Sequence, residues 1–63
     1  MSMITLPAFC LDEEFESLIL VDHDVRIIDR TDSPWNVTFE GSRENLISMV
    51  RIHWSEDDIV NIS

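Results

Sequence analysis

The sequence is poor in several residue types, and each shortage narrows what this protein can be. A single cysteine, Cys10, excludes an intramolecular disulfide and favours a reducing compartment. One glycine and two prolines beside 44% hydrophobic residues indicate a folded domain, not a disordered tail. No stretch approaches the ~20 apolar residues of a membrane span. The N-terminal stretch lacks the basic region of a secretory signal, so we expect a cytoplasmic protein.

Lysine is absent altogether, and this makes charge the outlying property of the chain. Thirteen acidic residues face four arginines, which gives a formal net charge of −9 over 63 residues. Self-repulsion of this size lowers stability and keeps a protein in solution. It also opposes direct binding to nucleic acid or to an anionic membrane. We therefore expect a basic partner.

A chain of this length is expected to form one acidic domain spanning residues 1–63. Such a small domain buries only ~60% of the surface of its unfolded chain. Its stability margin should therefore be small. No internal repeat or low-complexity tract interrupts it.

The clearest predicted element is an amphipathic helix within residues 41–54. Ser42 is a favourable N-cap, and Glu44 lies in the first turn, where the helix dipole favours a carboxylate. Gly41 is expected to allow a sharp turn out of a preceding strand. Apolar residues then recur at helical spacing and predict one buried face: Leu46, Ile47, Met49, Val50 and Trp54.

Before this helix, the pattern predicts a strand at 2–6, a helix at 12–20 and a hairpin of strands 25–30 and 35–40. Asp12 can cap the first helix, although the apolar run at 17–21 also suits a strand. The turn at 31–34 has Asp, Ser and Pro, which favour turns.

The last segment has two interpretations. Ser55 and Asp58 can cap a further helical turn, whereas the β-branched residues 59–62 suit a short strand. We predict the strand. The fold class is then α+β, in the order β-α-β-β-α-β, with two helices packed on one face of a small antiparallel sheet.

Candidate catalytic and metal-binding residues are few. Asp22, His23 and Asp24 could bind a divalent cation, but adjacent residues do not converge on one point, and we favour a solvated loop. Cys10 could pair with His23 or His53 as nucleophile and base, yet no supporting motif surrounds it, and a small buried residue is favoured. His53 is interpreted as a cation at a helix C-terminus. We expect no enzyme, no metal site and no cofactor.

The two tryptophans, Trp35 and Trp54, could anchor an interface, because tryptophan is frequent among residues that dominate binding energy. Each lies on the apolar side of its predicted element. Packing in the core is therefore favoured for both.

The acidic groups at 12–16 and 56–58 have no arginine near them in sequence, whereas Arg26 and Arg30 are expected to neutralise Asp24, Asp29 and Asp32. Carboxylates in rows can occupy a cleft built for phosphates, since duplex DNA carries one charge per ~1.7 Å of its axis. The predicted partner-binding acidic face consists of Glu13, Glu14, Glu16, Glu56, Asp57 and Asp58.

With DEEFE at 12–16, SEDD at 55–58 and no lysine, the chain resembles the small acidic anti-CRISPR proteins of phages, in particular those that mimic DNA. The resemblance is one of composition over the whole chain. It implies a non-enzymatic inhibitor, in the host cytoplasm, that occupies the DNA-binding site of a CRISPR effector subunit. The alternative is a small assembly module, such as a homodimer that pairs its terminal strand.

Overall fold

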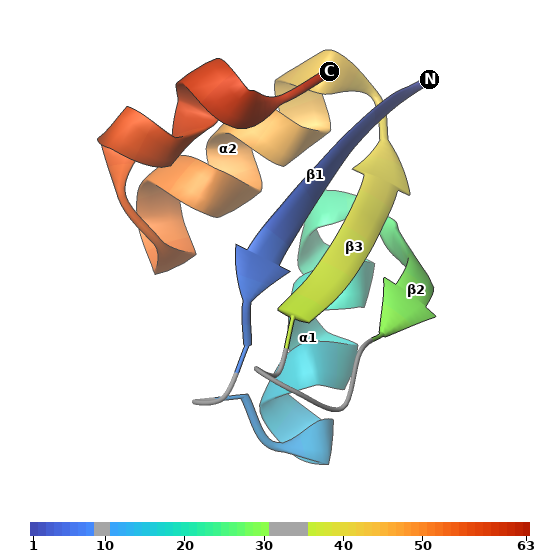
Figure 1. The fold of residues 1–63 in the computed structure, drawn as a ribbon. Helices are drawn as coiled ribbons and strands as arrows, with labels where there is room; N and C mark the ends of the chain where they lie inside the picture. Colours follow the sequence, from blue (N-terminus) through green and yellow to red (C-terminus); the bar gives the residue numbers. More distant parts are fainter. Residues whose placement is uncertain (9–10, 31–35) are drawn as a thin grey trace.

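The computed structural model describes residues 1–8, 11–30 and 36–63, and Figure 1 traces their path. The elements in chain order are β1 (Ser2–Pro7), α1 (Glu13–His23), β2 (Arg26–Arg30), β3 (Asn36–Gly41), α2 (Arg43–His53) and the 3₁₀-helix η1 (Glu56–Asn61). The strands form one antiparallel sheet in the order β1-β3-β2. The predicted α+β class is therefore confirmed.

Buried and more exposed side chains alternate along β1 and β3, so the two faces of the sheet differ. Ile4 and Leu6 of β1 are buried, and they lie opposite Phe39 and Val37 of β3 in the antiparallel register. The intervening side chains, such as Thr5 and Thr38, point to the other face, where their hydroxyl oxygens are 2.7 Å apart. The period-2 pattern thus gives one buried face and one face open to solvent.

β2 is an edge strand, paired with β3 only. The register shifts between Ile27 and Asp29, which leaves Ile28 as an extra, exposed residue in a bulge. A bulge and charged side chains on an edge strand both discourage pairing with another chain.

Both helices begin at the caps that the sequence predicts. Asp12 Oδ1 accepts a hydrogen bond from the backbone N–H of Phe15 at 2.7 Å, and Ser42 Oγ accepts one from Asn45 at 3.2 Å. α1 continues to His23 and ends at Asp24, which adopts the left-handed conformation with φ 51°. The alternative of a strand at 17–21 was therefore wrong, because a capped helix spans those residues.

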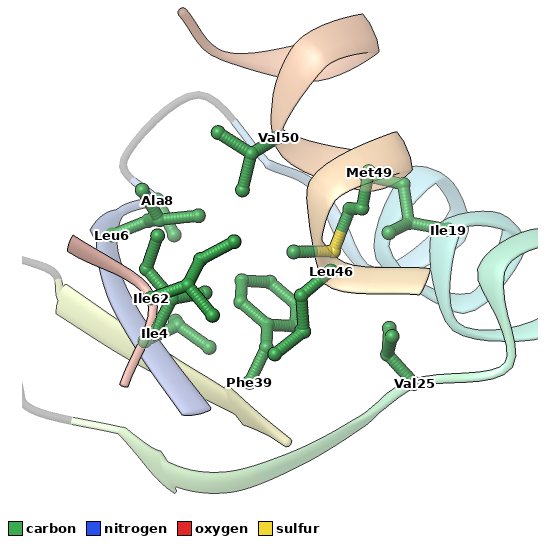
Figure 2. Packing of buried hydrophobic residues seen from close by; sticks show 11 residues of the cluster. Ile4, Leu6, Ala8, Ile19, Val25, Phe39, Leu46, Met49, Val50 and Ile62 are labelled. Carbon is green, nitrogen blue, oxygen red and sulfur yellow. The ribbon is translucent and has the colours of Figure 1, made fainter. Parts of the chain in front are cut away.

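Figure 2 shows how both helices cover the buried face of the sheet. Ile19 of α1 and Leu46, Met49 and Val50 of α2 belong to the same buried cluster as Phe39, which is fully buried. Trp54 packs edge-on against Phe39 with the ring centroids 5.6 Å apart, and its indole N–H donates to the carbonyl oxygen of Pro7 at 2.8 Å. The predicted core role of Trp54 is confirmed; Trp35 lies outside the described residues.

The last segment corrects the predicted strand at 59–62. Residues 56–61 form a 3₁₀-helix, because Ser55 Oγ accepts from the N–H of Asp57 while Asp58 Oδ2 accepts from the N–H of Ser55. This capping box, with acids in the first turn, outweighs the β-branched composition. Strand-like pairing is confined to Ser63, which exchanges two backbone hydrogen bonds with Met3, so both chain ends lie side by side (Figure 1).

Gly41 serves a different purpose from the one predicted. No glycine of the described chain has a positive φ, so the turn into α2 does not require glycine's conformational freedom. A Cβ at Gly41 would instead lie 3.0 Å from Val25 Cγ1. The small residue is needed for space, since β3 passes closely over the residue that precedes β2.

Candidate partner-binding surface

The first acidic group lies on the opening turn of α1. Glu13 and Glu14 are exposed, whereas Glu16 is half-buried and forms an ion pair with Arg30 of β2. The hydrogen bond to Glu16 raises the pKa of the Arg30 guanidinium, and the negative charge of Glu13 raises it further. In this turn the carboxylates of Glu13 and Glu14 are therefore exposed to solvent, whereas that of Glu16 links α1 to β2.

The second acidic group opens η1, and each of its members has a different environment. Glu56 lies 3.7 Å from Arg51 Nε in an exposed ion pair, and Asp58 caps the 3₁₀-helix. Asp57 is exposed. Within the described ranges, Glu13, Glu14 and Asp57 are the predicted site residues whose carboxylates make no hydrogen bond and no ion pair.

The expected neutralisation of Asp24 and Asp29 by Arg26 and Arg30 was wrong. Arg26 Nε donates to Glu40 Oε1 at 2.7 Å, and Arg30 pairs with Glu16. The reason is tertiary: Arg26 faces Glu40 across the β2–β3 register, and α1 brings Glu16 to the end of β2. Asp29 Oδ1 accepts from the backbone N–H of Arg30 at 2.8 Å, while Asp32 lies outside the described residues.

An aromatic contact connects the two acidic segments. Phe15, which lies between Glu14 and Glu16, packs edge-on against His53 with centroids 5.4 Å apart. The chain leaves α2 at His53 and enters η1 at Glu56. The first turn of α1 therefore contacts the end of α2, three residues before η1 begins.

Exposed apolar side chains lie on the same helix as the first acidic group. Leu18 is 54% exposed and Val21 is 79% exposed on α1, and Ile52 of α2 is 65% exposed. Sequence reasoning missed this feature. The signal was the unbroken apolar run at 18–21, which contains more apolar residues than one helical face can bury.

A second missed feature joins the C-terminal ends of both helices. His23 Nε2 and His53 Nε2 are 3.1 Å apart, with the rings nearly perpendicular at 84°. Burial, followed by the nearby His23, lowers the pKa of His53, while the charge of Asp22 opposes that change. The environment thus disfavours the cation that the helix terminus alone predicts.

The other candidate sites receive little support from the described part of the chain. Asp22 and Asp24 are exposed on either side of His23, and no three metal-ligating side chains converge among the residues described. Cys10 lies outside them, so its proposed pairing with a histidine has no geometry here. No described helix has the length and apolar character that crossing a bilayer requires.

Comparisons of the chain with protein-family models, with curated proteins and with solved structures give no match.

Proposed function

We propose that this protein is a non-enzymatic inhibitor whose carboxylates occupy the nucleic-acid-binding site of a basic host protein, with a CRISPR effector subunit as the target class. The observation that supports this most directly is the exposure of Glu13, Glu14 and Asp57, whose carboxylates form no ion pair or hydrogen bond within the described residues, on a chain of net charge −9. Such a protein would act in the cytoplasm of the host.

The physical basis is electrostatic complementarity. A cleft lined with lysine and arginine attracts a protein that carries exposed carboxylates, and steered association can be much faster than that of neutral partners. Direct binding to DNA is opposed by the same charge. The exposed apolar side chains of α1, Leu18 and Val21, can supply the contacts that fix orientation once the charges have met.

The test is a competition assay in which DNA binding by purified CRISPR effector complexes is measured with increasing inhibitor. The variant Glu13→Gln/Glu14→Gln/Asp57→Asn removes the three unpaired carboxylates and keeps the shape of the side chains. We expect wild type to block DNA binding and this variant to lose at least tenfold in potency. Inhibition should also weaken as salt is raised.

A matched control removes the same number of charges elsewhere. Asp22→Asn/Asp24→Asn/Glu44→Gln changes exposed carboxylates at the other end of α1 and the start of α2. On α1, Asp22 follows Glu13 by nine residues, which is about 13 Å at ~1.5 Å per residue. Retained potency in the control indicates a defined face. Equal losses would mean that only net charge matters, and full potency of the first variant would refute the proposal.

A homodimeric assembly module is the second candidate, and the exposed Leu18, Val21 and Ile52 favour it. The predicted strand at 59–62 cannot supply the pairing, because residues 56–61 are a 3₁₀-helix. Sedimentation of wild type and Leu18→Gln at micromolar concentration distinguishes the two functions. A dimer that resists salt and dissociates in the variant would favour the module over the inhibitor.

A further inference from the structure

The Nε2 atoms of His23 and His53 lie at a distance that fits both a hydrogen bond and the separation of two ligands on one metal ion. Two imidazole nitrogens bound to one metal at ~2.0–2.1 Å, with an angle of about 90–109° at the metal, lie about 2.9–3.4 Å apart. The two Nε2 atoms here are 3.1 Å apart. The backbone therefore already holds both rings at a spacing that suits a shared metal ion.

We propose that His23 and His53 form a binding site for a first-row divalent transition metal, with Zn²⁺, Ni²⁺ and Cu²⁺ as the class of ion. In the neutral pair one Nε2 donates its proton to the other. On binding, the donor ring changes to the Nδ1–H tautomer, so that both Nε2 lone pairs face the metal. Imidazole is a preferred ligand of these ions.

The surroundings favour this role. His53 is held edge-on by Phe15 at 5.4 Å and by Trp54 at 6.3 Å, which limits the rotation of its ring. Burial and the neighbouring His23 lower the pKa of His53, which disfavours the protonated form that cannot bind a metal. The net charge of −9 also concentrates cations around the molecule.

The site is open. No third His, Cys, Asp or Glu joins the pair in the part of the chain described here, so water would complete the coordination. Two ligands give a weaker site than the four of a structural zinc centre. Affinity should follow the general order in which Cu²⁺ exceeds Ni²⁺ and Zn²⁺.

The first measurement is a Zn²⁺ titration of tag-free wild type, followed by NMR of the histidine ring protons. We expect both rings to shift together and to saturate at one ion per chain, and the melting temperature to rise with Zn²⁺. Calorimetry should give at least tenfold weaker binding for His23→Gln. Its melting temperature without metal shows whether the variant is folded, and the ring signals of wild type test the site without any substitution.

Two controls separate this site from other ligands. Cys10→Ser removes the one thiol of the sequence, and Asp22→Asn removes the carboxylate next to His23 in the chain. Both should bind Zn²⁺ within about threefold of wild type, because the proposal assigns coordination to the imidazoles. The proposal is overturned if the two rings do not respond together, if His23→Gln binds as well as wild type, or if Cys10→Ser abolishes binding. The pair would then be a hydrogen bond between helices and nothing more.

Discussion

At the scale of the residue, two valines with the same side chain have opposite environments. Val50 of α2 is fully buried, in the layer between the helices and the sheet, whereas Val21 of α1 is 79% exposed. Truncation to alanine removes the same atoms from both residues. Any difference in the resulting loss of stability therefore reflects how each side chain is packed.

Val50→Ala should lower the free energy of unfolding by about 2–3 kcal/mol, the sum of lost burial and the cavity left behind. Val21→Ala should change it by less than ~0.5 kcal/mol. Urea denaturation followed by circular dichroism measures both. Similar losses in the two variants would contradict the packing described here, and a large loss at Val21 alone would indicate that a second chain covers α1.

Ion pairs also belong to this scale, and their contribution to stability is small. The Arg26 side chain is 70% exposed, and both members of the Arg51–Glu56 pair are more than half exposed. Exposed pairs typically contribute ~0–1 kcal/mol. Their importance here is for the acidic surface, because they decide which carboxylates remain free to meet a partner.

At the scale of the element, η1 depends on its cap. The 3₁₀-helix has no buried residue of its own, although Ile62 directly after it is buried. Its position relies on the bonds between Ser55, Asp57 and Asp58, on the half-buried Ile59 that packs against the core, and on Ile62.

Ser55→Ala should lower the free energy of unfolding by about 0.5–2 kcal/mol, since the N–H of Asp57 loses its acceptor. Ser48→Ala is the matched control. Ser48 is exposed within α2, where alanine is the better helix former, so this change should be neutral or slightly stabilising. Thermal melting of both variants, with hydrogen exchange of residues 56–61, measures the effect. Unchanged exchange in Ser55→Ala would show that the cap does not hold η1.

At the scale of the whole molecule, the net charge of −9 acts against the folded state. The chain carries thirteen acidic residues, its longest dimension is 26 Å, and no charged side chain is buried among the described residues. Many of these charges lie within a Debye length of each other at low salt, ~30 Å at 0.01 M.

Raising NaCl from about 0.01 M to about 0.3 M should therefore stabilise the protein, because screening weakens this repulsion more than it weakens three ion pairs. A gain of about 1 kcal/mol corresponds to ~4–8 °C in melting temperature for a domain of this size. The variant Glu13→Gln/Glu14→Gln/Asp57→Asn, with a net charge of −9 + 3 = −6, should gain less. A melting temperature that falls with salt would show that attractive pairs outweigh the repulsion.

The sequence by itself determined the features that depend on neighbours along the chain. The α2 stripe and its Ser42 cap, the alternation of β3, the Asp12 cap and the α+β class all follow from local periodicity and capping. The net charge needs no structure at all. The prediction of a strand at 59–62 was wrong because two local signals conflicted there. The capping box at Ser55 outweighed the β-branched composition of the segment.

Tertiary structure decided what depends on distant parts of the chain. The β2–β3 register places Arg26 opposite Glu40, and the packing of α1 on the sheet brings Glu16 to Arg30. Glu13, Glu14 and Asp57 form no ion pair within the described residues. The meeting of His23 and His53 joins residues 30 positions apart. No local pattern carries such information, because contacts between distant residues exist only once the helices have packed on the sheet.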